Sequence, residues 1–596
     1  MKNIYLGNTC LNNDDTNING AFVEIQGEKF YKITNYNQMP DFFMTIVSDS
    51  DHWLFISSNG SLSAGRKDRD NALFPYYSDD KINDYAGITG SKTIVLVEKS
   101  DKTFLWEPFS KELSSVYKIE RNLYKSEYGN KIIFEEINSD LEITYKYGWY
   151  NSEQFGFIKK ASITNQSNTI GKLEIVDGIC NILPNGVDYN FQNEYSNLLD
   201  GYKKNELIEE TGLGLFLLSS IPVDKAEPSE SLNATTVWSA GLDNNKTLLT
   251  NKQLDKFKKG LQIDTEIDQK ACRGCFFVSA SLEIEQQQKQ EWIIVSEINQ
   301  DTTDVANLNL FLKSKQNFLE VVDTDIKKGT TNLIKIVAGA DGLQMSNEEL
   351  CSARHFSNTL FNIMRGGTYI NNYCIESSDF RKFVQQTNIK LFSKLDTVLT
   401  KLPKTITNQH LLQLTSTTNN ADLTRICYEY LPLTFSRRHG DPSRPWNLFS
   451  IENKNTDGTP KSDYQGNWRD IFQNWEALCL SYPEYIENII SKFINASTPD
   501  GYNPYRIMRE GIDWECPDHD DPWAYIGYWC DHQIIYLQKL LELSANYHPG
   551  KIDELLSKEI FVYANVPYRI KSYQDILKNP QDTIIFDAKL NDKITS

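Results

Sequence analysis

The chain has 596 residues, of which 40% are apolar and 24% charged, a composition that is ordinary for a folded protein and argues against extensive disorder. Its net charge of −19 at pH 7 is the opposite of the basic footprint of a nucleic-acid-binding protein, so we expect no nucleic acid as a partner. The sequence begins without a signal peptide, and no run reaches the ~18 apolar residues of a membrane span, so we expect a cytoplasmic protein with no membrane partner.

Sequence motifs exclude several other classes of protein. The ten cysteines are scattered, and Cys272 with Cys275 forms a lone C-x-x-C pair, which is a weak signal for a metal or redox site. We therefore expect reduced thiols and no metal. The chain has no phosphate-binding P-loop, no dinucleotide fingerprint, no H-E-x-x-H and no G-x-S-x-G motif.

The first half of the chain is typical of a β structure. β-Branched and aromatic runs alternate with turns rich in Gly, Asn and Asp, as in residues 131–145, where an Asn-Ser-Asp turn separates two apolar runs. Many short strands of this kind predict a large antiparallel β-sandwich over residues 1–300. The predicted strands include residues 43–56, 93–97, 131–134, 141–145, 155–161, 173–179, 214–218, 275–282 and 291–298.

Helices follow the strands. Residues 302–312 and 318–326 have a mixed pattern, whereas 347–364 and 379–399 have helical periodicity, so we predict a helical linker over residues 301–400. Residues 401–596 are predicted to be helical at 408–414, 420–431, 468–480, 483–495, 523–546 and 549–556. A run of strands followed by a run of helices predicts an α+β multidomain protein, as expected for a chain longer than the ~250–300 residues of a single core.

The first candidate stretch for function is residues 436–447. Its glycine and prolines exclude a helix, so it forms a shaped loop. Arginine side chains suit phosphate or sugar hydroxyls, and the alternative is a structural loop held by Arg–Asp pairs. Its candidate substrate-binding residues are Arg437, Arg438, His439, Asp441, Arg444 and Trp446.

The second candidate stretch is a helix predicted at residues 468–480, with Asn467 as its N-cap. Trp468, Ile471, Phe472, Trp475 and Leu478 share one face of this helix. The opposite face has no lysine, which favours a sugar-binding surface over an ordinary solvated face. The candidate substrate-binding residues on it are Arg469, Asp470, Gln473, Asn474 and Glu476.

The third candidate stretch, residues 503–523, is rich in carboxylates and aromatic residues. Clustered carboxylates raise one another's pKa, which suits general-acid catalysis, and the alternative for such a cluster is a bound cation. Asp521 also has a structural explanation, as the N-cap of a helix that begins with Pro522. Asp513 and Glu515 are the candidate catalytic residues; Tyr505, Arg506, Trp514, Asp521 and Trp523 are candidate substrate-binding residues.

Several of these motifs carry a family resemblance. Residues 56–66 (Ile-Ser-Ser-Asn-Gly-Ser-Leu-Ser-Ala-Gly-Arg), 70–76 (Asp-Asn-Ala-Leu-Phe-Pro-Tyr) and 78–81 (Ser-Asp-Asp-Lys) resemble glycoside hydrolase family 94, which holds cellobiose phosphorylase and its relatives. Residues 469–474 resemble the R-D-x-x-Q-D helix of that family, and residues 520–523 resemble its D-D-P-x-W segment. The resemblance spans nearly the whole chain.

The resemblance implies a large antiparallel β-sandwich, a helical linker and part of an (α/α)6 barrel over residues 401–596. It also implies that Arg469 and the polar residues at 470–476 hold the sugar, although Asn474 stands where the family usually has Asp. The Trp-Asn-Asp motif that carries the family's general acid is absent, since Trp446-Asn447 is followed by Leu448. Six helix pairs need on the order of 250–350 residues, so we expect an incomplete barrel. Either the chain is an N-terminal portion of a longer protein or a separate chain supplies the rest, and we expect the general acid to lie in that missing part.

The implied reaction is inverting phosphorolysis of a β-linked oligosaccharide to a sugar 1-phosphate, with inorganic phosphate as co-substrate and no cofactor. One alternative is an inverting hydrolase or transglycosylase of the same clan, with Asp513 or Glu515 as base. The other is a non-catalytic half that binds glycan or docks to a partner subunit. The expected partners are therefore an oligosaccharide and phosphate, with a homodimer or a second chain completing the barrel.

Overall fold

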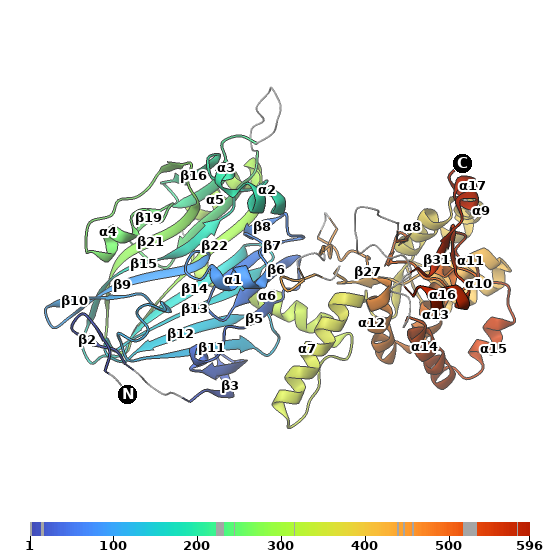
Figure 1. The fold of residues 1–596 in the computed structure, drawn as a ribbon, viewed down its shortest axis with the longest axis horizontal. Helices are drawn as coiled ribbons and strands as arrows, with labels where there is room; N and C mark the ends of the chain where they lie inside the picture. The colour runs from blue at the N-terminus through green and yellow to red at the C-terminus, as the bar shows by residue number, and fades with distance from the viewer. Residues whose placement is uncertain are drawn as a thin grey trace. The chain divides into compact units, whose positions relative to one another are not determined.

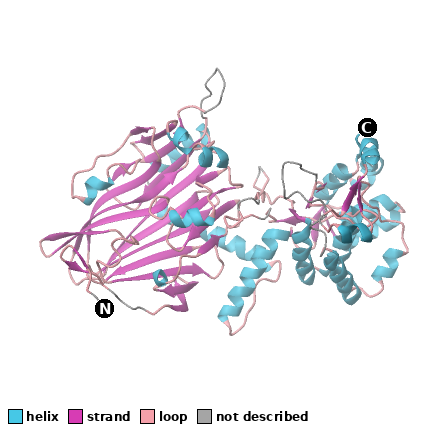
Figure 2. Ribbon diagram, in the orientation of Figure 1, coloured by secondary structure: helices cyan, strands magenta, loops and turns pink. Residues whose placement is uncertain are grey.

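The structure is a computed structural model, in which the chain divides into two compact units. It describes residues 3–12, 17–221, 232–243, 245–314, 316–437, 440–444, 448–455, 458–515, 533–580 and 582–596. The first unit comprises Met1–Ile334 with Gly440–Phe449, and the second comprises Lys335–His439 with Ser450–Ser596. Strands dominate the first unit and helices the second (Figure 2). The predicted α+β class, with a large antiparallel β structure preceding the helices, is confirmed.

Antiparallel sheets form the body of the first unit (Figure 1). Among the described residues, the largest sheet has eleven strands in the order β20-β16-β17-β18-β22-β14-β13-β12-β11-β4-β3, and a second has five in the order β10-β9-β15-β21-β19. Strands β5 to β8 form a four-stranded sheet, and β1 pairs with β2. The predicted hairpin at residues 131–145 is confirmed, because β12 pairs with β13.

The strands of the first unit are β1 (Tyr5–Leu6), β2 (Thr9–Cys10), β3 (Asn19–Ile25), β4 (Glu28–Thr34), β5 (Phe43–Ile46), β6 (His52–Ser57), β7 (Leu62–Arg66), β8 (Ala72–Phe74), β9 (Gly90–Lys99), β10 (Lys102–Trp106), β11 (Ile119–Ser126), β12 (Ile132–Asn138), β13 (Ile143–Ser152), β14 (Gly156–Asn165), β15 (Gly171–Ile182), β16 (Lys203–Ile208), β17 (Leu213–Leu218), β18 (Ala234–Ala240), β19 (Lys246–Leu248), β20 (Asp268–Lys270), β21 (Gly274–Ile284) and β22 (Lys289–Gln300). Its helices are η1 (Tyr36–Gln38), α1 (Asp79–Asp84), α2 (Tyr189–Glu194), α3 (Ser196–Asp200), α4 (Leu254–Lys258), α5 (Thr302–Lys313) and α6 (Phe318–Ala338), which crosses into the second unit.

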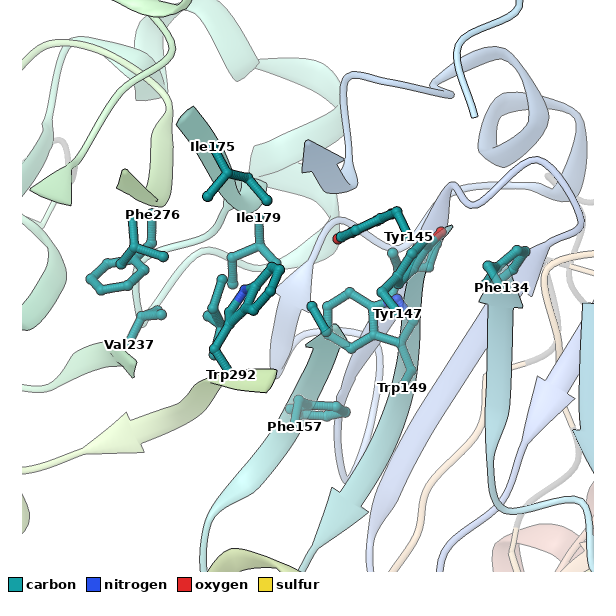
Figure 3. Packing of buried hydrophobic residues seen from close by; sticks show 14 of the residues in the cluster. Phe134, Tyr145, Tyr147, Trp149, Phe157, Ile175, Ile179, Val237, Phe276 and Trp292 are labelled. Carbon is teal, nitrogen blue, oxygen red and sulfur yellow. The ribbon is translucent and has the colours of Figure 1, made fainter. Parts of the chain in front are cut away.

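The core of the first unit lies between the eleven-stranded and five-stranded sheets (Figure 3). Side chains alternate along a strand, so Tyr145, Tyr147 and Trp149 of β13 enter the core together. They face Ile175 and Ile179 of β15, and all five side chains are buried.

A buried ion pair joins the two sheets. Lys159 on β14 binds Asp177 on β15 at 2.6 Å, and neither side chain is exposed to solvent. Burial lowers the pKa of Lys159 from its ordinary value, and the nearby carboxylate opposes that shift. The carboxylate also accepts hydrogen bonds from Thr93 (2.6 Å), Tyr145 (2.8 Å) and Trp292 (2.7 Å). The charges are therefore compensated by a complete set of partners.

Helices α5 and α6 cover the outer face of the eleven-stranded sheet. Leu312 of α5 and Val322 of α6 pack against Ile158, Ile293 and Val295 of the sheet. The mixed pattern assigned to residues 302–312 and 318–326 is corrected here, since both segments are helical. A capping box begins α5: the Asp301 carboxylate accepts from the backbone of residues 303 and 304, and the Asp304 carboxylate accepts from the backbone of Asp301.

The second unit is mainly helical. Its elements are α7 (Glu349–Gly366), β23 (Thr368–Tyr369), β24 (Cys374–Glu376), α8 (Ser377–Thr387), α9 (Ile389–Leu399), β25 (Thr405–Thr407), α10 (Asn408–Thr418), α11 (Ala421–Glu429), β26 (Leu433–Thr434), β27 (Gln465–Asn467), α12 (Trp468–Ser481), η2 (Pro483–Tyr485), α13 (Ile486–Ala496), β28 (Arg506–Met508), β29 (Ile512–Asp513), α14 (Ile534–Tyr547), α15 (Lys551–Leu556), β30 (Tyr568–Ile570), α16 (Tyr573–Lys578), β31 (Ile584–Phe586) and α17 (Ala588–Thr595). No helix of the described residues has the length and apolarity needed to cross a membrane.

Residues 374–430 build a small core of their own within the second unit. Phe380, Phe383, Leu411, Ile426 and Tyr430 are among its buried members. The single helix predicted at residues 379–399 is two helices, α8 and α9. The break lies at residue 388, an asparagine whose side chain caps α9 by accepting a hydrogen bond of 2.9 Å from the backbone of residue 391.

Residues 440–449 belong to the first unit although they follow residues of the second in sequence. Phe449 is buried and packs against Trp53, Phe55 and Tyr76, with ring centroids 5.6, 6.2 and 5.5 Å away. The backbone N–H of Asp79 donates to the Pro442 carbonyl at 3.2 Å. These contacts fasten the segment to the sandwich.

Candidate functional site

A three-stranded sheet in the second unit brings two of the predicted stretches together. β28 pairs with β27 on one side and with β29 on the other. In this register Asn467, Arg506 and Asp513 lie side by side across the sheet. The backbone N–H of Trp468, the first residue of α12, donates to the Tyr505 carbonyl at 2.9 Å. The N-terminus of α12 and the Tyr505–Asp513 hairpin therefore form one substructure.

Asp513, a predicted catalytic residue, is held by a predicted substrate-binding residue. Arg506 donates from Nε to Asp513 Oδ2 at 2.8 Å, and its terminal nitrogen makes a second, shorter contact with the same oxygen. Tyr505 beside them is exposed. Both contacts of Arg506 are made with the same carboxylate oxygen of Asp513.

Helix α12 divides into the two faces that its sequence predicts, with one exception. Trp468, Phe472 and Trp475 are buried, and the rings of Trp468 and Phe472 lie 4.6 Å apart. Arg469 and Gln473 are exposed on the other face, with Asp470 and Glu476 partly buried there.

Asn474 is the exception. The prediction placed it on the polar face, whereas the structure buries it, with 9% of its surface exposed. Its Nδ2 donates to Asn362 Oδ1 of α7 at 2.8 Å, and Asn362 donates back to the Asn474 carbonyl at 3.0 Å. At 100° per residue Asn474 lies at the border of the apolar face, next to Leu478, so packing of α7 against α12 covers it.

Helix α14 contacts the polar face of α12. Tyr536 donates to Gln473 Oε1 at 3.3 Å, and Lys539 lies 3.5 Å from Glu476. The polar face therefore has both solvent-exposed residues near its N-terminal end and residues tied to a neighbouring helix. Of the predicted substrate-binding residues on α12, Arg469 and Asp470 lie on its first turn and directly follow β27 in the sequence.

Aromatic rings continue the substructure after β29. Trp514 stacks on Tyr568 with an interplanar angle of 19° and a centroid distance of 5.9 Å, and it lies 5.5 Å from Tyr502. Aromatic faces of this kind suit the apolar faces of sugar rings. Glu515 follows directly and is partly buried.

The predicted loop of residues 436–447 is divided between the two units. Ser436 accepts from the Gln465 N–H of β27 at 3.4 Å, and the Arg437 N–H donates to the Met364 carbonyl at 2.6 Å, so its first residues belong beside the candidate site. Asp441 and Arg444 belong to the first unit. Five further predicted residues lie outside the described residues: Arg438, His439, Trp446, Asp521 and Trp523.

A polar pocket that sequence reasoning missed lies in the second unit. Its volume is 590 Å³, and its lining includes Asp379, Tyr430, Ser462, Asp463 and Arg509. None of these residues was predicted as part of a site, although Arg509 lies three residues after Arg506. Within the part of the chain that the structure describes, no group of three or more His, Cys, Asp or Glu residues could hold a metal ion.

Comparison with known proteins gives one family match. Residues 369–432 match the model of glycoside hydrolase family 149 insertion domain 1. The matched segment nearly coincides with the small core of residues 374–430. No curated protein sequence matches the chain.

Two solved structures are similar to the chain at low identity. A bacterial glucoamylase complexed with acarbose is 11% identical with a TM-score of 0.34, covering 85% of this chain and 68% of that one. A protein assigned as a kojibiose phosphorylase, from the human microbiome, is 10% identical with a TM-score of 0.30, covering 90% of this chain and 64% of that one. The family match connects the chain, through residues 369–432, to the carbohydrate-active glycoside hydrolases.

Proposed function

We propose that the chain belongs to a carbohydrate-active enzyme that cleaves a β-linked oligosaccharide by inverting phosphorolysis. The observation that carries the proposal is the substructure in which the first turn of α12, which includes Arg469 and Asp470, follows directly on β27, and β27 pairs with the strand that carries Arg506. Arginine, carboxylate and amide groups on a fixed backbone are the donors and acceptors that sugar hydroxyls need. The family match of residues 369–432 supports the same class of substrate.

In the proposed reaction, a carboxylic acid gives its proton to the glycosidic oxygen as the bond from that oxygen to the anomeric carbon breaks. An oxygen of inorganic phosphate forms the new bond to the anomeric carbon from the opposite face, which inverts the configuration and yields a sugar 1-phosphate. Asp513 is the candidate acid, with Glu515 as the second carboxyl group. Arg469, Asp470 and Tyr505 contact the sugar.

Turnover of a panel of β-linked disaccharides, with and without phosphate, tests this proposal. We expect phosphate-dependent release of a sugar 1-phosphate, and we expect Asp513→Asn to lower the rate by about 10²–10⁴-fold, the range for loss of an acid–base group. Asp422→Asn, at an exposed carboxylate of α11, is the matched control and should leave turnover unchanged. Release without phosphate would identify a hydrolase instead. Folded protein without turnover would place the acid elsewhere.

A subunit-docking role is the second candidate, because apolar side chains are exposed near the end of the chain. Ile534 is 61% exposed, Leu556 75%, Tyr573 71% and Leu577 59%. Exposed apolar surface marks interaction sites when it is contiguous. Association of the protein in sedimentation experiments, together with absent turnover, would favour this role over catalysis.

A further inference from the structure

The 590 Å³ pocket of the second unit contains buried polar atoms that lack partners within the described residues. Arg509 is 7% exposed, and its Nη2 binds both carboxylate oxygens of Asp379 at 2.9 Å. Its other terminal nitrogen, Nη1, is buried without a hydrogen-bond partner, and so is the Ser462 hydroxyl. An unsatisfied buried donor is destabilising, so a ligand that satisfies these atoms gains affinity.

The rest of the lining presents both donors and acceptors. Tyr430 is 1% exposed and donates to Asp379 Oδ2 at 2.6 Å, which helps to hold this carboxylate in the pocket lining. Burial raises the pKa of Asp463, another lining residue, from its ordinary value. The volume lies within the range of about 300–1,000 Å³ that is typical of small-ligand sites.

The charge of the lining argues against an anion. The lining contains more carboxylates than cations. The carboxylates are Glu376, Asp379, Asp463 and Glu510, and the cations are Lys382, Lys461 and Arg509. A phosphate group would be repelled by that excess, whereas a neutral polyhydroxy ligand offers oxygens to the arginine and hydroxyl protons to the carboxylates. Ten of the lining residues, from Ile370 to Pro432, lie in the segment matched by the insertion-domain model.

The pocket is distinct from the candidate active site. Arg506 lies on β28, whereas Arg509 lies in the turn that joins β28 to β29. The two arginines bind different carboxylates: Arg506 binds Asp513, and Arg509 binds Asp379. The pocket lining does not include Arg506, Asp513 or any residue of α12.

We propose that this pocket binds one sugar unit of a neutral oligosaccharide. It is an accessory site formed by the insertion segment (residues 369–432), residues 459–463 and the turn that joins β28 to β29. The proposal rests on the carbohydrate activity proposed above and adds a second binding site to it. Arg509 Nη1 and the Ser462 hydroxyl contact sugar hydroxyls, and Asp379 accepts from them.

A cysteine in the pocket provides the test. Cys374 lines the pocket and is exposed, and Cys351 on α7 is an exposed cysteine outside the lining. A disulfide reagent is added to the full chain, and peptide mass mapping measures the rate at which each cysteine is modified. The rates are compared with and without β-1,2-, β-1,3-, β-1,4- and β-1,6-linked glucose disaccharides. At ten times the dissociation constant, a disaccharide should slow modification of Cys374 about tenfold and leave Cys351 unchanged.

Two variants test whether the protection of Cys374 comes from a disaccharide bound in the pocket. Ser378→Trp narrows the pocket from the exposed start of α8 and leaves the Arg509–Asp379–Tyr430 network intact, so protection of Cys374 should disappear while the protein stays folded. Ser462→Ala should weaken protection several-fold, because it removes one buried hydroxyl.

The outcomes separate this proposal from the one on which it rests. Protection that Ser378→Trp abolishes supports the pocket. Disaccharide turnover, or calorimetric binding, without protection of Cys374 overturns the pocket and leaves the proposed activity intact. Protection by inorganic phosphate alone would overturn the assignment of a neutral ligand. A lack of both binding and turnover with every disaccharide would reject both proposals.

Discussion

Lys159 and Asp177 are opposite charges that the sandwich encloses completely. Removing water from two charges is costly, and their mutual attraction offsets that cost because the carboxylate also receives three other hydrogen bonds. Loss of one partner leaves the other charge buried alone. The pair therefore makes folding of the first unit sensitive to a single side chain.

We expect Lys159→Met to lower the free energy of unfolding of the first unit by about 3–5 kcal/mol, as for other broken buried pairs. Urea denaturation measures the change. Lys172→Met, which removes the Lys172–Glu283 pair on neighbouring strands, is the matched control, because these side chains are 58% and 69% exposed. An exposed pair contributes about 0–1 kcal/mol. Equal effects of the two substitutions would show that burial of the Lys159 pair does not govern its contribution.

At the scale of elements, the contact between α7 and α12 depends on a glycine. The Trp475 indole N–H donates to the Gly366 carbonyl at 2.7 Å, at the last residue of α7. A β-carbon added to Gly366 would lie 2.8 Å from the Asn474 β-carbon. The two helices therefore approach too closely at this point for any larger residue.

Gly366→Ala should destabilise the second unit by about 1–3 kcal/mol, the usual cost of overpacking, although alanine favours a helix by up to about 1 kcal/mol. Thermal unfolding followed by circular dichroism measures the change. Gly511→Ala is the control within the same unit, since an added β-carbon there meets nothing within 4 Å. A stabilised Gly366→Ala variant would mean that helix propensity outweighs the contact with Asn474.

The sequence predicts an element correctly where the burial of its side chains follows from the residues of that element alone. The apolar run of residues 93–97 predicts a strand, and the spacing of Trp468, Phe472 and Trp475 predicts the apolar face of α12; the structure confirms both. Asn474 was placed on the wrong face because a border position is decided by its neighbour helix, which periodicity does not reveal. The helix break at residue 388 was missed for a similar reason, since apolar periodicity continues across it.

The candidate site was predictable in part. Arg506 and Asp513 are close in sequence, and the hairpin that joins them brings both beside α12. Asp379 and Arg509 are 130 residues apart, and no local pattern marks either as a member of a pocket. A contact of that sequence separation depends on the packing of the insertion segment, which the sequence alone does not reveal.

At the scale of the whole molecule, the segment Gly440–Phe449 connects the folding of the first unit to distant sequence. Phe449 fills a space among Trp53, Phe55 and Tyr76, three aromatic residues from the beginning of the chain. The first unit is thus not complete at Ile334.

Phe449→Ala should lower the free energy of unfolding of the first unit by about 3–5 kcal/mol, the usual cost of removing a buried phenylalanine. Leu448→Ala changes the preceding residue, which is 42% exposed, and should cost within about 0.5 kcal/mol. Urea denaturation of both variants, followed by tryptophan fluorescence, makes the comparison. Similar values for the two would show that the segment rests on the sandwich without stabilising it.

The return of residues 440–449 to the sandwich also sets an order for folding during synthesis. A ribosome adds about 5–20 residues per second, so the nascent chain waits several seconds between the last strand of the sandwich and the arrival of Phe449. During that interval Trp53, Phe55 and Tyr76 are present without their partner, while the insertion segment is being translated. The sandwich therefore reaches its final packing only after the helices up to residue 430 have been translated, because its last buried aromatic side chain, Phe449, is made after them.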